Sequence, residues 1–207
     1  MIVTLLEQQK KDKGRYSVFI DGEFAFGLSA ADIEYFKIKE GFEISETTYN
    51  YITDSLIYIK AQDIALKFLG YKMRTEKEVV KKLSEKEFSD EIISRVMDFL
   101  NKYGYVDDRK YCEAYIKECN RLKPKGKYLI KYELLQRGID ESIIYDAFEN
   151  TEVDEVSNAV KLLRKKIKDF SNIDFKEKQK AFAMLQRKGY DYDVIKEAFS
   201  IASSNDF

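Results

Sequence analysis

The chain has 207 residues, of which 44% are hydrophobic and 35% are charged. This balance supports a folded core and excludes a disordered protein. Basic and acidic residues nearly cancel, to a net charge of −1, so overall charge does not indicate a nucleic-acid-binding protein. The absence of histidine removes the commonest general base and the commonest metal ligand together.

Short runs of β-forming residues occupy the first 45 positions. The runs are residues 2–6, 16–20 and 23–28. Asp21-Gly22 between the last two is a strong hairpin signal, and Ser29 is placed to cap a short helix through Phe36. Residues 39–44 are expected to add a turn or a short strand. We expect a small antiparallel sheet that packs on the first helical module, since this head is too small to fold alone.

From Asp54 onward the apolar spacing is helical. One stripe runs from Ile57 until Gly70 ends it. Residues 75–78 form a capping box at the start of a second helix. Ser89 is placed to cap a third helix, which Gly104 stops. These three helices form one module.

Two further modules follow at a constant offset of 51 residues. The positions in phase are Leu83, Leu134 and Leu185; Phe88, Ile139 and Tyr190; and Ile93, Ile144 and Ile195. A fixed period of this length is typical of units that stack on their neighbours and bind other macromolecules, which argues against an enzyme. The predicted fold is mainly α, with three tandem three-helix repeats in an elongated curved array behind a β-rich N-terminal extension. The predicted boundaries are 1–54 for the extension and 55–106, 107–152 and 153–207 for the repeats.

Two cysteines and the N-terminus bear on cellular location. Cys112 and Cys119 are seven residues apart in a predicted helix, which places them about 10 Å apart and beyond disulfide reach. We interpret them as buried apolar thiols. The N-terminus lacks the pattern of a signal peptide, and no long apolar run is present. A cytoplasmic protein is predicted.

Asp107 and Asp108 are adjacent, and paired carboxylates invite a metal or acid-base interpretation. The alternative is a helix N-cap, where a carboxylate meets the positive end of the helix dipole. Nothing nearby supplies further ligands, so we assign the pair to capping. No catalytic residue, metal or cofactor is predicted.

A basic segment precedes and opens the second helix of the second repeat. Its cations, named here the second-repeat cluster, are Lys117, Arg121, Lys123, Lys125, Lys127 and Lys131. The loop ahead of a helix N-terminus suits phosphates or acidic side chains, although a solvated face is equally typical. Tyr128 and Tyr132, one turn apart, either stack on bases or pack in the core or in a groove.

A second group of cations lies in the first helix of the third repeat. These residues, named here the third-repeat cluster, are Lys161, Arg164, Lys165, Lys166 and Lys168. The apolar stripe of this helix, from Val156 to Ile167, is expected on the opposite face. Here too a solvated surface is the alternative to a binding site.

Three-helix modules resemble helix-turn-helix DNA readers, in which the third helix enters the groove. In this chain the third helices, residues 141–149 and 192–199, are acidic on balance. Base-specific recognition is therefore disfavoured, whereas sequence-independent contact through the first helices stays open.

Residue types and spacing in the second repeat closely resemble the regulatory protein RecX family. The matching residues are Gly104, Tyr105, Val106, Asp107, Asp108, Tyr111, Ala114, Tyr115, Lys125, Gly126, Ile130, Glu133, Leu134, Gly138 and Ile139. Residues 74–76 with Leu83 look like the first-repeat counterpart, and residues 20–23 are similar to the extension of longer members. One departure is Glu87, which stands where the later repeats have Gly138 and Gly189, so this helix is expected to end differently.

The resemblance implies a cytosolic bacterial modulator of RecA recombinase without catalysis of its own, acting in DNA recombination, repair and the SOS response. Such a protein binds the RecA nucleoprotein filament along its groove, mainly as an inhibitor, and is expected to be a monomer without membrane contact. The two basic clusters are the candidate contacts with RecA or DNA phosphates. The alternative is a sequence-independent single-strand-binding protein that acts without RecA.

Overall fold

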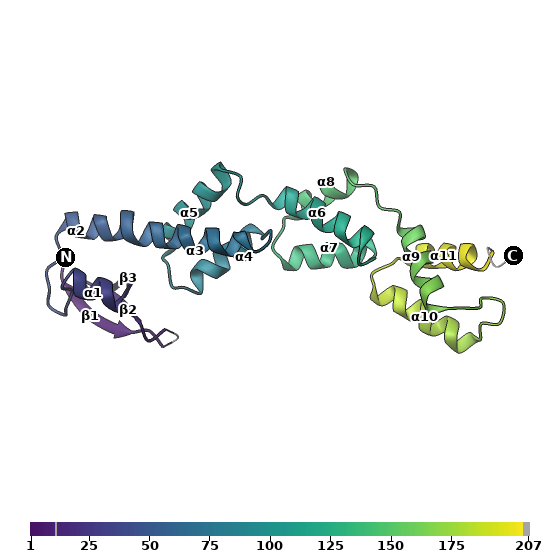
Figure 1. The fold of residues 1–207 in the computed structure, drawn as a ribbon, viewed down its shortest axis with the longest axis horizontal. Helices are drawn as coiled ribbons and strands as arrows, with labels where there is room; N and C mark the ends of the chain where they lie inside the picture. Colours follow the sequence, from purple (N-terminus) through teal and green to yellow (C-terminus); the bar gives the residue numbers. More distant parts are fainter. Residues whose placement is uncertain (11, 205–207) are drawn as a thin grey trace. The chain divides into compact units, whose positions relative to one another are not determined.

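The computed structural model describes residues 1–10 and 12–204. The chain forms two compact units, Met1–Val106 and Asp107–Phe207, whose helices and strands are labelled in Figure 1. The prediction of a mainly helical chain with a small β-rich head is confirmed. The last three positions of the predicted third repeat lie outside the described residues.

The head is a three-stranded antiparallel sheet in the order β1-β2-β3. The strands are β1 (Val3–Gln8), β2 (Arg15–Ile20) and β3 (Glu23–Ser29). The predicted hairpin is confirmed, since Asp21 and Gly22 both have positive φ, 51° and 90°, as a two-residue turn that matches strand twist requires. Ser29 caps helix α1 (Ala30–Tyr35) through a capping box with Asp32.

The first long helical stretch begins earlier than its apolar pattern suggests. Helix α2 (Glu46–Asn50) continues into a π-helix (Tyr51–Ile57) and then into α3 (Tyr58–Gly70). The predicted boundary between the head and the first repeat, at residue 54, lies inside the π-helix. A π turn is wider than an α turn, so it shifts the apolar face and interrupts the 3.6-residue spacing that reveals a helix.

Two capped helices complete the first repeat. Thr75 and Glu78 form the predicted capping box of α4 (Glu76–Ser84), and Ser89 caps α5 (Asp90–Lys102). Sheet and helices share one apolar core, whose fully buried members include Val18, Leu28, Leu83, Val96 and Leu100. The prediction that the head packs on the first repeat is therefore confirmed.

The C-terminal unit contains the second and third repeats. The second consists of α6 (Asp108–Arg121), α7 (Lys127–Gln136) and α8 (Glu141–Glu149). The third consists of α9 (Glu155–Lys166), α10 (Phe175–Arg187) and α11 (Tyr192–Ser204). Each repeat has its own apolar cluster, with Leu134 and Ile144 at most 1% exposed in one and Leu185 and Ile195 fully buried in the other. The in-phase residues are thus the core of the repeats.

The second helix ends in the same way in all three repeats. Glu87, Gly138 and Gly189 have positive φ of 59°, 84° and 83°. In each case the next residue donates its N–H to the backbone carbonyl of the in-phase leucine. Ile139 donates to Leu134 at 3.2 Å, and Phe88 donates to Leu83 at 3.4 Å. The expectation that Glu87 ends its helix differently is therefore wrong. Hydrogen bonding and the burial of Phe88 hold the turn although Glu87 has a Cβ.

Candidate macromolecule-binding surface

Asp107 is a helix cap. Its Oδ1 accepts the N–H of Lys110 at 3.0 Å. This hydrogen bond, partly opposed by burial, holds the pKa of Asp107 below its usual range. Within residues 1–10 and 12–204 no group of three or more potential ligands is placed to hold a metal ion. The interpretation of Asp107 as a helix cap is confirmed.

The two cysteines lie inside the second repeat as predicted. Cys112 is fully buried, Cys119 is 3% exposed, and both are free thiols. Burial raises the pKa of Cys112 to about 11, so this thiol stays protonated and unreactive at neutral pH.

Lys125 points into the second repeat, where it joins Tyr115 and Glu133. Its Nζ donates to the two carboxylate oxygens of Glu133 at 2.7 and 2.5 Å, and to the Tyr115 hydroxyl at 3.1 Å. The Tyr115 hydroxyl donates to the same carboxylate at 2.5 Å. Only 21% of the Lys125 side chain is exposed. Lys125 therefore holds in place the loop that precedes α7, unlike the other cations of its cluster.

The pKa values of this network reflect its charge balance. Burial acts to raise the pKa of Glu133, but hydrogen bonds from Lys125 and Tyr115 outweigh it and the pKa lies below its usual range. Burial acts to lower the pKa of Lys125, but the bonds to Glu133 and Tyr115 outweigh it and the pKa is raised. Both groups are charged at neutral pH.

Arg137 extends the network on its aromatic side. Its guanidinium lies 5.8 Å from the ring centre of Tyr111 and 5.6 Å from that of Tyr115. The two rings are nearly parallel, with an interplanar angle of 10°. Four residues of the sequence motif, Tyr111, Tyr115, Lys125 and Glu133, thus come together to support the loop.

The N-terminus of α7 already holds an anion from the chain itself. Gly126 is the N-cap and offers no side-chain acceptor. Glu155 of the third repeat supplies one instead, since its Oε1 accepts the N–H of Lys127 at 2.8 Å. The position at which the sequence suggested a phosphate or an acidic side chain is occupied by an acidic side chain.

The remaining cations of the second-repeat cluster lie on the surface. Lys117 and Lys123 make loose ion pairs with Glu113 and Glu118, at 3.7 and 3.9 Å. Lys131 pairs with Glu141 of α8. Arg121 and Lys127 are exposed and make no ion pair within the described part of the chain.

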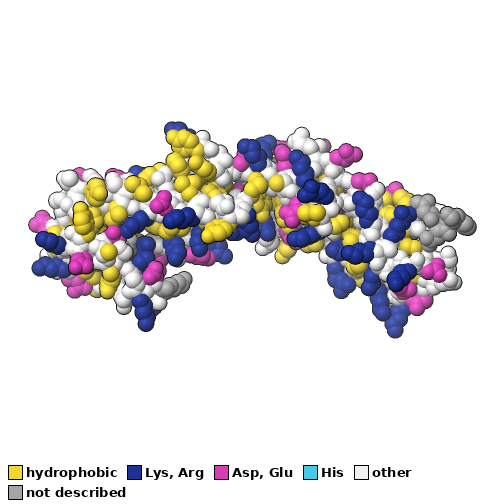
Figure 2. Space-filling view, viewed as in Figure 1, with side chains coloured by type: hydrophobic (Ala, Val, Ile, Leu, Met, Phe, Trp, Pro, Cys, Tyr) yellow, Lys and Arg dark blue, Asp and Glu magenta, His cyan; other side chains and the backbone are white. Residues whose placement is uncertain are grey.

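The third-repeat cluster is more open. Lys161, Arg164, Lys165, Lys166 and Lys168 are all exposed, and none of them forms an ion pair with another described residue. The opposite face of α9 is buried, as predicted, but α9 ends at Lys166 and Ile167 is extended, so Lys168 lies beyond the helix in which the sequence placed it. Figure 2 shows Lys and Arg side chains gathered over α9 and α10.

Several contacts fix the third repeat against the second. Gly126 donates its N–H to the carbonyl of Lys188 at 2.9 Å. A Cβ on Gly126 would lie 2.1 Å from the carbonyl oxygen of Gly189. Asn120 donates to the carbonyl of Glu152 at 3.1 Å and accepts from buried Asn158 at 3.3 Å. Both basic clusters therefore belong to one packed unit.

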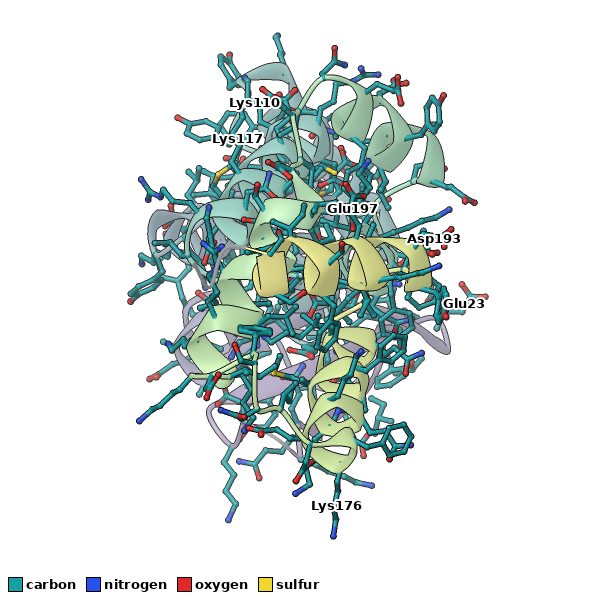
Figure 3. All side chains as sticks on the ribbon, turned by 90° about the vertical axis from the view of Figure 1, so that its right-hand side faces the viewer. Glu23, Lys110, Lys117, Lys176, Asp193 and Glu197 are labelled. Atoms are coloured by element: carbon teal, nitrogen blue, oxygen red, sulfur yellow. The ribbon has the colours of Figure 1, made fainter. Side chains whose placement is uncertain are left out.

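Exposed rings lie on the outer face of α7. Tyr128 is 77% and Tyr132 53% exposed, so the interpretation that this pair packs in the core is wrong. Figure 3 shows Asp193 and Glu197 projecting from α11, in agreement with the acidic character predicted for the third helices.

No helix in the described residues is long and apolar enough to cross a membrane.

Fold and surface together define a helical-repeat protein with two groups of exposed cations on its C-terminal unit, and family models match along most of the chain. They are Regulatory protein RecX N-terminal domain at residues 1–45 and RecX first, second and third three-helix domains at residues 61–100, 107–147 and 152–199. The chain belongs to the RecX family.

Similar proteins extend over nearly the whole chain. Regulatory protein RecX of Clostridium acetobutylicum is 37% identical, over 96% of each chain. That of Bacillus subtilis is 34% identical over 95% of this chain and 75% of its own. A crystal structure of regulatory protein RecX superposes with a TM-score of 0.63, at 30% identity over 95% of this chain and 98% of its own. RecX from Lactobacillus salivarius gives 0.64 at 29% identity, over 71% of this chain and 97% of its own.

Proposed function

We propose that this chain binds the RecA nucleoprotein filament in the cytoplasm and limits its extension, and with it the ATPase and strand exchange of RecA. Membership of the RecX family supports a regulatory role. The observation that carries the proposal is that the cations of both basic clusters, apart from Lys125, lie exposed on one packed unit. Such a surface suits the acidic side chains of a protein filament and the phosphates that the filament encloses.

The third-repeat cluster is the stronger candidate contact. Its cations make no ion pair among the described residues, so they are available to a partner. In the second-repeat cluster Arg121, Lys123 and Lys127 remain available, whereas Lys125 belongs to the loop support. Tyr128 and Tyr132 add an exposed aromatic edge of the kind that interfaces favour.

The test is inhibition of the single-strand-DNA-dependent ATPase of RecA by charge-reversed variants. One variant combines Arg121→Glu with Lys123→Glu, and a second combines Arg164→Glu with Lys165→Glu. A matched control, Lys176→Glu with Lys180→Glu, reverses two exposed cations of α10 in neither cluster. We expect the control to inhibit like the parent and the second variant to require about tenfold more protein, as for a few lost charge contacts.

Failure of the parent protein to inhibit at equimolar RecA would refute the proposal. Equal loss in all three variants would show that net charge, rather than a located surface, is responsible. Titration of naked single-stranded DNA against salt tests the alternative of binding without RecA, for which log K falls by about 0.7 per phosphate neutralised. Inhibition combined with weak binding to naked DNA supports the filament as the target.

A further inference from the structure

A groove in the N-terminal unit lies outside the cationic surface. It has a volume of about 330 Å³, and its walls come from β3, the π-helix with its flanks, and the turn that leads into α5. Neither the basic clusters nor the support of the α7 loop involves these residues. The groove therefore needs a separate explanation.

The floor of the groove is apolar. Phe26, Ile57, Phe88 and Ile92 line it and are 3–7% exposed. Phe24, on the wall, is 42% exposed and its ring meets that of Phe19 edge to face. A space of this size, with a rigid floor and one exposed ring, accommodates one or two apolar side chains.

One wall of the groove is an open sheet edge. β3 is the last strand of the sheet, and four consecutive residues, Phe24 to Gly27, line the groove. A β-bulge at Ala25 breaks the alternation of side chains, since Phe24 pairs with Phe19 and Phe26 pairs with Val18, so consecutive residues of this strand line the groove. Arg15 closes the far end of this edge by donating to the carbonyl of Gly27 at 3.1 Å. An extended segment is the ligand that pairs with such an edge.

The groove lining holds three carboxylates and one cation, Arg95, and the Arg15 guanidinium lies 5.6 Å from the ring centre of Phe88. Asp54 is neutralised by Arg95, whose Nη1 lies 2.6 Å from its Oδ1. Glu87 and Glu91 are exposed and make no ion pair among the residues that the structure describes. Both line the groove beside the apolar floor. The charge of the mouth is thus complementary to Lys or Arg side chains.

We propose that this groove binds an extended cationic segment of another protein. The segment pairs with the edge of β3, places an apolar side chain on the floor between Phe26 and Phe88, and presents Lys or Arg to Glu87 and Glu91. This contact goes beyond the proposed function, since it lies on the other unit and selects a partner of opposite charge.

The test uses two fluorescein-labelled octapeptides, one alternating Lys and Val and one alternating Glu and Val. Binding to the full chain is followed by fluorescence anisotropy at about 50 mM salt, where surface charges are only partly screened. We expect the basic peptide to bind and the acidic peptide not to bind. Glu87→Gln combined with Glu91→Gln should weaken the basic peptide about fivefold, as expected for two exposed ion pairs.

A matched control separates the groove from general attraction. Glu85→Gln combined with Asp90→Asn removes two exposed carboxylates from the same turn outside the groove and should leave the affinity unchanged. Equal weakening by both double variants, similar affinity for both peptides, or no binding of the basic peptide would each overturn the proposal. Because RecA and DNA are absent from this assay, its result is independent of the proposed function.

Discussion

Gly126 and Gly189 bring the backbones of the second and third repeats into direct contact. A Cβ on Gly126 would lie 2.1 Å from the Gly189 carbonyl oxygen, and a Cβ on Gly189 would lie 2.4 Å from Leu129. Backbone cannot yield as a flexible side chain does, so either position tolerates only glycine. The contact explains how two repeats with separate apolar clusters form one unit.

Gly126→Ala should destabilise the C-terminal unit by at least about 2 kcal/mol, because the added methyl overpacks a site bounded by backbone. The measurement is urea unfolding followed by circular dichroism. Gly70→Ala is the control, since a Cβ there meets nothing within 4 Å, and it should be neutral or slightly stabilising. Equal midpoints for Gly126→Ala and the parent would contradict the close approach.

Glu87→Gly should stabilise the N-terminal unit by about 1 kcal/mol, because Glu87 holds a positive φ that glycine adopts without strain. Gly138→Glu makes the reverse exchange at the equivalent turn of the second repeat and should destabilise by a similar amount. Thermal unfolding of the two variants gives the comparison. A loss of stability in Glu87→Gly would mean that the Glu87 side chain contributes more than its backbone strain removes.

Glu133→Gln should cost about 2 kcal/mol at neutral pH, because it leaves Lys125 partly buried without its charged partner. The control is Glu141→Gln, whose ion pair with Lys131 is more exposed, and its effect should stay below about 0.5 kcal/mol. Urea midpoints measure both. Similar losses in the two variants would refute a special role for Glu133.

The same network predicts a pH dependence. The pKa of Glu133 is lowered by folding, so its stabilisation is present above the ordinary glutamate pKa of about 4.3 and is lost as pH falls through the lower folded value. The pKa of Lys125 is raised by folding, so its contribution persists below about pH 10.4 and declines at higher pH. Parent stability should therefore fall more steeply than that of Glu133→Gln as pH drops below about 5. Parallel curves would contradict the assignment.

Glu155→Gln should destabilise the C-terminal unit by about 1 kcal/mol, since it weakens the only side-chain acceptor observed at the N-terminus of α7 among the described residues. Glu152→Gln is the control, because Asn120 binds the backbone carbonyl of Glu152 rather than its carboxylate. Chemical denaturation of the two variants measures the difference. An unchanged midpoint for Glu155→Gln would exclude capping from the third repeat.

Local signals predicted most of the helices and their ends. Thr75, Ser89 and Asp107 cap the helices that follow them, because a short polar side chain satisfies free backbone donors wherever it precedes a helix. The start of the first long helix was missed, since the π-helix at Tyr51–Ile57 breaks the regular spacing. The left-handed turn at Glu87 was missed as well, because the residue type alone favours a different ending.

The three repeats, their in-phase leucines and the two groups of cations could be read from the amino-acid sequence, since periodicity and composition are local properties of the chain. Which of these cations face outward depends on how the helices pack. Lys125 and Arg164 look alike in sequence, but one binds Glu133 and Tyr115 inside its repeat and the other is exposed. The contact of Gly126 with Gly189 and the capping of α7 by Glu155 join residues far apart in the chain. Such contacts depend on how the repeats pack, and the spacing within one repeat carries no information about that packing.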